Sequence, residues 1–235
     1  MLDPTGRVAM ISGANRGLGL AISRRLSAEG YLLSLGARDL DALAAATADF
    51  DDERTIRHRY DAHDRSCPAS WVAATVDRFG SLSAVVNNAG AAVVAPLEET
   101  TEDQLDEMWE VNVKAPLRTI QAALPHLRAD GEGRIVNVAS MSGKRVKSGR
   151  ATAYEMSKFA MMALSASARF AGWDDGVRVT ALCPSWMATG MGEGFGIDPA
   201  TMSQPEDVSA LVATVLSLPN TSTVPELLVN CRLEP

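Results

Sequence analysis

The stretch VAMISGANRGLG, residues 8–19, joins a short apolar run to three closely spaced glycines. Val8–Ile11 has the length of a buried strand, and a helical pattern follows the glycines to about Glu29. Glycines at such a turn let the backbone approach a pyrophosphate, and the helix start supplies amide donors. A plain glycine-rich turn is the alternative. The strand–turn–helix context favours dinucleotide binding, with candidate residues Gly13, Asn15, Arg16, Gly17, Leu18 and Gly19.

Short apolar runs and helical patterns alternate along the rest of the chain. We expect further strands at 31–35, 55–60, 82–87, 134–139, 177–182 and 227–231. We expect helices at 40–48, 67–79, 102–127 with an interruption near Pro116, 152–173 and 206–217. This alternation predicts βαβ units, and hence one doubly wound (Rossmann) α/β domain over 1–235, with about seven parallel strands and helices on both faces. Such folds bind ligands at the carboxyl ends of their strands.

Composition excludes several classes of protein. The net charge of -7 argues against a nucleic-acid partner, since phosphates attract a basic surface. No apolar run approaches the roughly 18–20 residues of a membrane span, and residues 1–17 do not read as a secretory signal. Three cysteines without metal-ligand spacing indicate reduced thiols in a cytoplasmic protein, and no metal site is expected.

The segment YEMSK, residues 154–158, places a phenol and an ammonium one helical turn apart. Taken alone, the pair is an ordinary helix surface, with the lysine stem lying over apolar neighbours. A tyrosine has an ordinary pKa of about 10, which suits neutral pH poorly. One cation about 4 Å away contributes about 4 kcal/mol at an effective dielectric near 20, or roughly 3 pKa units. Tyr154 and Lys158 are therefore candidates for an acid and the group that tunes it.

Five motifs stand in a recognisable order. They are S-G-x-x-x-G-x-G from Ser12, N-N-A-G at 87–90, Asn112 in a helical pattern, Ser140 after an apolar strand, and Y-x-x-x-K at 154–158. Together they resemble the short-chain dehydrogenase/reductase family over nearly the whole chain, with Ser12 in place of the usual threonine. The resemblance implies hydride transfer between a nicotinamide cofactor and a carbonyl/alcohol pair.

The resemblance also implies roles for single residues. Tyr154 would be the general acid/base, and Lys158 would hold the cofactor ribose and, with the charge of oxidised nicotinamide, lower the pKa of Tyr154. Ser140 would hydrogen-bond the reacting oxygen, with Ser142 as its local rival. Asn112 would take part in a water-linked proton relay to Lys158. The segment Asn88, Ala89 and Gly90 would shape the cofactor side of its strand end.

The choice between NADP and NAD depends on the end of the second strand. The family's NAD-selecting aspartate would fall at Ala37, and Arg38 follows it. Arg16 and Arg38 favour NADP(H), since an arginine there pairs with the 2'-phosphate. Asp39 is a competing partner for Arg38, so NAD(H) stays open. Asp61 matches the family's adenine-contacting aspartate.

The chain departs from the family pattern after the sixth strand. Pro184 and Thr189 match cofactor-contacting positions, but Ser185 stands where glycine is usual. The loop 184–203, with Met187, Met191, Phe195 and Ile197, is either a mobile lid over an apolar pocket or packed core.

Other features bear on substrate and partners. Lys144, Arg145, Lys147 and Arg150 form a basic loop, 144–150, which is either solvated or attracts an anionic substrate. The family implies a homodimer or homotetramer, often built through the two long helices, although the usual D-G-G near the end is missing. A nucleotide-sensing regulator and a methyltransferase are rival classes, and neither requires the full set Asn112, Ser140, Tyr154 and Lys158.

Overall fold

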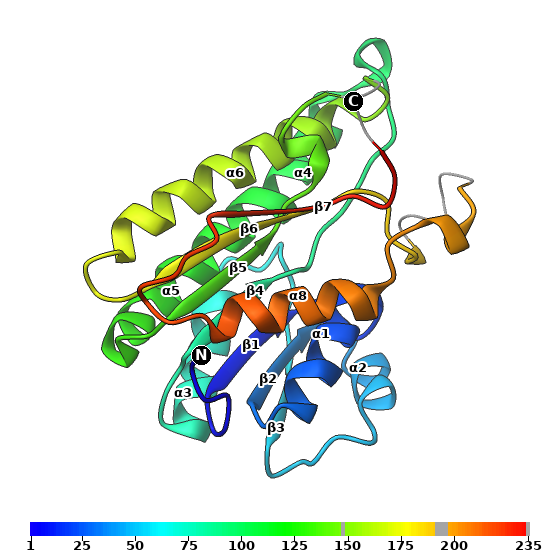
Figure 1. Cartoon of the computed structure of the whole chain (residues 1–235). Coiled ribbons are helices and arrows are strands. Elements are labelled where there is room, and N and C mark those ends of the chain that lie inside the picture. The colour runs from blue at the N-terminus through cyan, green and yellow to red at the C-terminus, as the bar shows by residue number, and fades with distance from the viewer. Residues whose placement is uncertain (147–148, 191–196, 234–235) are drawn as a thin grey trace.

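A parallel sheet forms the centre of the molecule (Figure 1). The computed structural model describes residues 1–146, 149–190 and 197–233. Within them, seven strands lie in the order β3-β2-β1-β4-β5-β6-β7, all neighbours parallel. Their bounds are β1 Val8–Ser12, β2 Leu32–Ala37, β3 Thr55–Arg59, β4 Ala84–Asn87, β5 Arg134–Val138, β6 Arg178–Pro184 and β7 Glu226–Val229. The predicted doubly wound sheet is confirmed, and its strand order reverses between β1 and β4.

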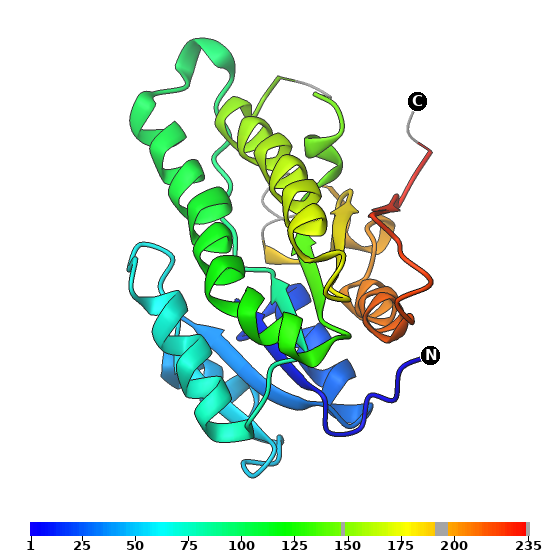
Figure 2. The ribbon, with the colours of Figure 1, turned by 90° about the vertical axis from the view of Figure 1, so that its left-hand side faces the viewer.

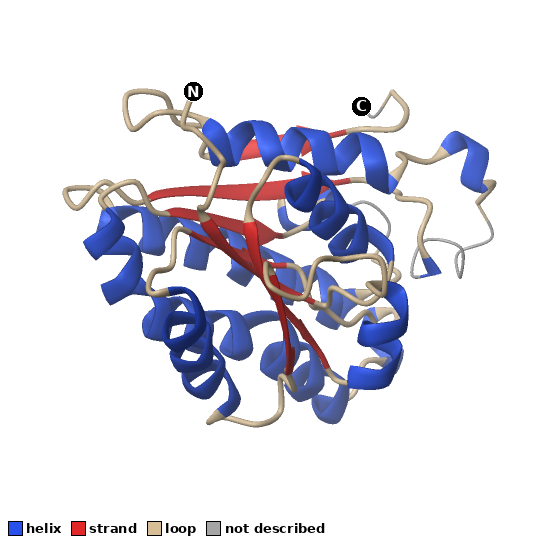
Figure 3. Cartoon of the chain, turned by 90° about the horizontal axis from the view of Figure 1, so that it is seen from below, coloured by secondary structure: helices blue, strands red, loops and turns tan. Residues whose placement is uncertain are grey.

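Helices cover both faces of the sheet (Figures 2 and 3). One face packs against α1 (Gly17–Ala28), α2 (Leu40–Ala46) and α8 (Pro205–Ser217). The other packs against α3 (Cys67–Phe79), α5 (Ala115–Asp130) and α6 (Thr152–Gly172), which lie side by side in Figure 2. Each face has its own apolar core, because the strands between them are apolar on both sides.

The predicted long helix at 102–127 is divided into three parts. It begins as α4 (Glu102–Trp109), capped by reciprocal hydrogen bonds between Thr101 and Gln104. A π-helical turn, η2 (Glu110–Lys114), follows, and α5 continues from Ala115. The interruption expected near Pro116 therefore lies just before that proline, which occupies the first turn of α5, where proline is tolerated.

In the described ranges, three short 3₁₀ turns connect the larger elements. They are η1 (Leu97–Glu99), η3 (Met141–Gly143) and η4 (Pro199–Thr201). None of the described helices is long and apolar enough to cross a membrane.

Candidate active site

The glycine turn connects β1 to α1 at the carboxyl edge of the sheet. Gly13 and Gly17 have backbone φ angles of 67° and 53°, in the left-handed region that favours glycine. A Cβ on Gly19 would collide with the carbonyl oxygen of Gly13, whereas Leu18 is buried in the core. Within the described part of the chain no side chain caps the start of α1 at Arg16, so no cap there takes up the first helical amides. The turn has the close-approach geometry that phosphate binding requires.

The hydroxyl of Ser12 joins the glycine turn to the segment after β4. Its Oγ accepts hydrogen bonds from the backbone N of Asn88 and of Ala89, each at 3.0 Å. The Asn88 amide donates to the Ser12 carbonyl oxygen at 2.9 Å and to that of Gly13 at 3.3 Å. Asn88 and Ala89 therefore fix the glycine turn against the neighbouring strand.

Asn112 lies on the π turn and is buried. Its Nδ2 donates to the carbonyl oxygen of Ala91, and its Oδ1 accepts from the backbone N of Ala91, both at 2.9 Å. Its Nδ2 also donates to Ser157 Oγ at 3.0 Å, and that hydroxyl donates to the carbonyl oxygen of Tyr154 at 2.7 Å. No hydrogen bond between Asn112 and Lys158 occurs in the described structure, so the water-linked relay stays a prediction.

Ser157 is a site residue that the sequence analysis did not single out. It links the π turn to the helix that carries Tyr154 and Lys158. The sequence did offer a signal for it. Ser157 directly precedes Lys158 in the predicted helix, and a small hydroxyl side chain can be buried there. Gly90 lies in the same region, since a Cβ there would stand 3.3 Å from Asn112 Oδ1 and 3.8 Å from Lys158 Nζ.

Tyr154 and Lys158 lie one turn apart on α6. The Lys158 Nζ is 5.5 Å from the centroid of the Tyr154 ring and donates to the Val138 carbonyl oxygen at 2.9 Å. Ser140 follows β5, and its side chain hydrogen-bonds that of Tyr154. Its rival Ser142 donates a backbone N–H to Ser140 Oγ at 3.1 Å. The structure therefore brings Ser140, Tyr154 and Lys158 together where β5 ends.

Burial acts on the two ionisable side chains in opposite directions. It raises the pKa of the Tyr154 phenol, while the hydrogen bond with Ser140 lowers it. It lowers the pKa of the Lys158 ammonium from 10.5 to about 8. The Lys158 charge thus does not bring Tyr154 toward neutral pH in the protein alone. The predicted lowering included the charge of oxidised nicotinamide and stays a prediction.

Two arginines lie exposed near the ends of β1 and β2. Arg16 follows the half-buried Asn15 in the glycine turn, and Arg38 comes directly after β2. The Asp39 carboxylate accepts a hydrogen bond from the backbone N of Ala42 at 2.9 Å and so caps α2. Among the described contacts Asp39 forms no ion pair with Arg38, so the competing partnership considered above is not formed.

Asp61 lies in a small charged cluster after β3. Its carboxylate accepts from the backbone N of His63 and pairs with Arg59, each at 3.1 Å. These hydrogen bonds, led by the His63 amide, lower the pKa of Asp61. His63 Nε2 also lies 2.7 Å from a carboxylate oxygen of Glu107 on α4. The cluster joins the end of β3 to α4.

The unusual Ser185 fixes the chain after β6. Pro184 pairs with Val229 of β7, and Ser185 N donates to the Val229 carbonyl oxygen at 2.8 Å. Ser185 Oγ accepts from the backbone N of Cys231 at 3.0 Å. Thr189 lies against the glycine turn, since a Cβ on Gly17 would stand 3.3 Å from its methyl group.

Backbone hydrogen bonds join the two ends of the loop at 184–203. Ser203 N donates to the Trp186 carbonyl oxygen at 3.1 Å, and Ala188 N donates to the Ser203 carbonyl oxygen at 3.0 Å. Ile197 is half-buried, and the Met191 and Phe195 of the expected lid lie outside the described residues.

One lysine of the basic loop 144–150 already has an acidic partner. Lys144 Nζ pairs with Glu226 Oε2 of β7 at 2.6 Å. Arg150 is exposed, and Lys147 lies outside the described residues.

The fold and this arrangement at the strand ends define the class of protein, a Rossmann-type α/β protein of the oxidoreductases. The model of the short chain dehydrogenase family matches residues 7–199, and the chain belongs to that family. An alcohol dehydrogenase from the archaeon Thermococcus sibiricus, solved with 5-hydroxy-NADP, superposes with a TM-score of 0.87 at 31% identity, covering 95% of each chain.

Two curated relatives carry more specific names. Agropine synthesis reductase of Rhizobium rhizogenes is 39% identical over 97% of this chain and 53% of its own length. The 2-(R)-hydroxypropyl-CoM dehydrogenase of Xanthobacter autotrophicus is 35% identical over 79% of this chain and 76% of its own. The chain thus spans about half the length of the first relative. The expected family is confirmed.

Proposed function

We propose that this protein transfers a hydride between NADP(H) and a carbonyl/alcohol substrate. The observation that carries the proposal is the meeting of Ser140, Tyr154 and Lys158 where β5 ends, at the same carboxyl edge of the sheet as the glycine turn. Asn112 and Ser157 join the π turn to the helix that carries Tyr154. A bound nicotinamide supplies or accepts the hydride. The residues that would hold the cofactor are the glycine turn, Arg16 and Arg38, Asp61, the segment 88–90, Tyr154, Lys158, Pro184 and Thr189.

Tyr154 is the proton donor during carbonyl reduction and the acceptor in the reverse direction. Ser140 hydrogen-bonds the substrate oxygen and holds it beside the phenol. Lys158 holds the ribose hydroxyls and places a positive charge near the Tyr154 ring, which favours the phenolate in the presence of oxidised cofactor. Asn112 fixes the segment after β4, and its water-linked relay to Lys158 belongs to this proposal.

The preference for NADP rests on Arg16 and Arg38. Both side chains are exposed, and Asp39 is engaged in capping α2. A guanidinium binds a phosphate through paired N–H donors, whereas the free 2'-hydroxyl of NAD needs an acceptor such as a carboxylate. The Thermococcus relative was solved with an NADP derivative. An NAD-dependent enzyme of the same family is the alternative.

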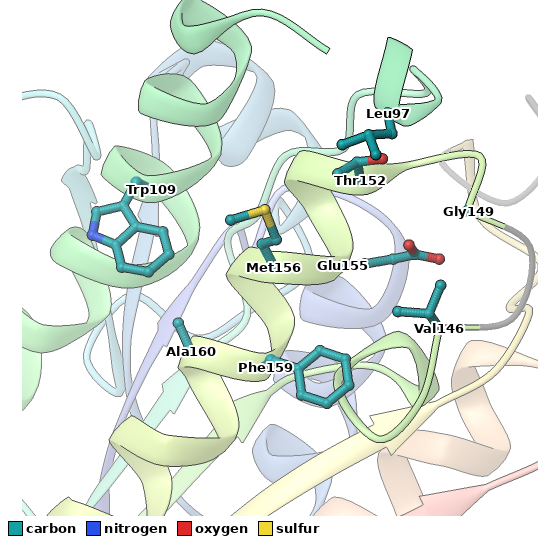
Figure 4. Close-up of a pocket in the computed structure, with 9 residues that line it drawn as sticks. All are labelled: Leu97, Trp109, Val146, Gly149, Thr152, Glu155, Met156, Phe159 and Ala160. Atoms are coloured by element: carbon teal, nitrogen blue, oxygen red, sulfur yellow. The ribbon is translucent and has the colours of Figure 1, made fainter. Parts of the chain in front are cut away.

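The exposed face of α4 and α6 suits a second copy of the chain. Figure 4 shows Met156, Phe159 and Ala160 of α6 between Trp109 of α4 and the loop at Val146. They line a hollow of about 580 Å³ in which large apolar side chains stay exposed. Apolar surface of this kind is typical of protein interfaces. We propose a homodimer or homotetramer in which this face is covered.

Two further expectations belong to the proposal. The whole chain, 1–235, is one catalytic domain with the loop at 184–203 beside the substrate. Its three cysteines, all free, suit the reducing cytoplasm.

Thermal melting with NADPH, NADH or no ligand tests the proposal first. A ligand that binds the folded state raises the melting temperature as its concentration exceeds its Kd. We expect the larger rise with NADPH, followed by loss of reduced-cofactor absorbance with a panel of carbonyl compounds. A larger rise with NADH would replace the cofactor but keep the reaction. No rise with either would favour a regulatory protein on the same fold.

A further inference from the structure

Arg59 ends β3 directly beside the end of β2. The two strands pair in register with Ala37 opposite Arg59, and Tyr60 N donates to the Ala37 carbonyl oxygen at 2.9 Å. Opposed residues on neighbouring strands point to the same face of a sheet. Ala37 packs in the core beneath α1 and α2, so Arg59 lies on the face where α2 begins, next to Arg38.

Three arginines thus follow three neighbouring strands in a protein whose net charge is -7. Arg16 belongs to the turn after β1, Arg38 follows β2, and Arg59 ends β3. Asp39 and Asp61 lie among them, and each carboxylate accepts a backbone N–H, from Ala42 and His63 respectively. Guanidinium groups that follow neighbouring strands offer paired N–H donors to an anion such as a phosphate.

The Arg59 side chain has donors left for a ligand. It is 59% exposed, and one of its terminal nitrogens pairs with Asp61 at 3.1 Å. A guanidinium has five N–H donors, and this is the one ion pair of Arg59 among the described residues, so most of its donors stay available.

We infer that Arg59 is a third arginine for the ribose phosphate of the dinucleotide, acting with Arg16 and Arg38. The inference rests on the proposed NADP preference and adds a specificity-determining residue to it. Because NAD lacks that phosphate, Arg59 contributes to NADP binding alone.

The variant Arg59→Gln tests the inference through binding rather than turnover. Titration calorimetry with NADP, NAD, 2',5'-ADP and 5'-AMP separates the phosphate from the adenine. We expect the Kd of NADP and 2',5'-ADP to rise about threefold to tenfold, as for one hydrogen bond at a solvent-exposed position, with NAD and 5'-AMP unchanged. Arg65→Gln is the matched control, since it removes an exposed positive charge a few residues away.

Each other outcome has a definite meaning. Equal weakening of NADP and NAD would show that Arg59 acts through Asp61 on the adenine, and would overturn the inference. An unchanged Kd for NADP in a folded variant, or an equal effect of Arg65→Gln, would also overturn it. If the wild type prefers NADP and this preference depends on Arg38, these outcomes contradict only the role of Arg59. If the wild type does not prefer NADP, the cofactor proposal is contradicted as well.

Discussion

At the scale of single residues, burial disfavours the charged forms of both Tyr154 and Lys158. A phenol that is hard to ionise and an ammonium that is easily deprotonated follow from the same low dielectric. With a pKa of about 8, Lys158 still carries most of its positive charge at pH 7, whereas the Tyr154 phenol, whose pKa is raised, stays neutral.

Replacing Tyr154 by phenylalanine removes the proposed proton donor and little else. We expect turnover to fall by about 10²–10⁴-fold, the usual contribution of general acid catalysis, with cofactor affinity retained. Steady-state kinetics and cofactor titration measure the two effects. Tyr60→Phe, which removes a buried phenol hydroxyl that contacts Thr119 and none of Ser140, Tyr154 and Lys158 among the described contacts, is the control and should keep turnover. Near-normal activity of Tyr154→Phe would contradict the assignment.

The lowered pKa of Lys158 predicts how stability depends on pH. Between about pH 8 and 10.5 the unfolded chain holds a proton on this lysine that the folded chain has released. Stability from this group therefore rises with pH across that window. We expect the unfolding free energy of the wild type to gain about 2–4 kcal/mol relative to Lys158→Met over it. Urea unfolding below, within and above the window measures the gain, and a constant difference would refute it.

Arg38 tests the choice of cofactor. Arg38→Asp replaces a cation for the 2'-phosphate by an acceptor for a ribose hydroxyl, so we expect the preference to move from NADP toward NAD by about tenfold or more. The ratio of kcat/KM for the two cofactors measures it. Arg65→Asp makes the same charge change at a nearby exposed position and should leave the ratio in place.

At the scale of elements, two serines of α6 make the same kind of contact: each accepts a hydrogen bond from an asparagine amide and donates one to a backbone carbonyl oxygen of its own helix. Ser157 Oγ accepts from Asn112 Nδ2 and donates to the Tyr154 carbonyl oxygen. Ser165 Oγ accepts from Asn137 Nδ2 at 2.9 Å and donates to the Met161 carbonyl oxygen at 2.8 Å. The first links the helix to the π turn, and the second links it to β5.

These matched serines separate stability from positioning. We expect Ser157→Ala and Ser165→Ala each to lower the unfolding free energy by about 1 kcal/mol, since each removes the acceptor of one N–H of a buried amide group. Only Ser157→Ala should also lower turnover, by about tenfold, because it releases the π turn from the backbone of Tyr154. Denaturant unfolding and kcat measurements compare them. Equal turnover in the two variants would exclude a positioning role for Ser157.

The sequence predicts the elements more closely than their ends. The strand predicted at 31–35 is β2, Leu32–Ala37, and it extends two residues further because Gly36, a residue unfavourable in strands, hides its end. The strand has a glycine at position 36 because Trp71 and Tyr60 occupy the space that a side chain there would need. Neither contact is visible without the fold.

The π turn was equally hidden. The sequence shows one helical pattern with a proline in it, and the extra residue of η2 leaves no signature of its own. Asn112 was found through motif order, whereas its partners Ala91 and Ser157 needed the structure.

At the scale of the whole molecule, the proposed assembly depends on α6. Phe159 is 43% exposed beside the hollow at Trp109 and Met156. We expect Phe159→Asp to yield a monomer, because a carboxylate buried in an apolar interface is strongly unfavourable. Light scattering after size exclusion measures the mass. Leu40→Asp places the same charge on an exposed leucine of α2 and should leave the mass unchanged. A monomeric wild type would contradict the assembly.

Contacts between distant segments were beyond the sequence. Ser185 was noted as a departure from the family pattern, as was the missing D-G-G, but only the structure shows Ser185 holding the backbone of Cys231. Lys144 was grouped with a basic loop, yet it pairs with Glu226 of β7. Each depends on which strands become neighbours.

The π turn has a consequence for how this chain tolerates length changes. Each residue of a regular helix advances the direction of the next side chain by about 100°. The wider turn at Glu110–Lys114 lets α4 keep one angular phase and α5 another, so Asn112 faces Ala91 while Ile120 and Leu127 face the core. Deleting one residue from η2 would straighten the helix but rotate one segment against the other. The protein would then lose either the packing of α5 against the core or the contact of Asn112 with Ala91, whichever residue of η2 was removed.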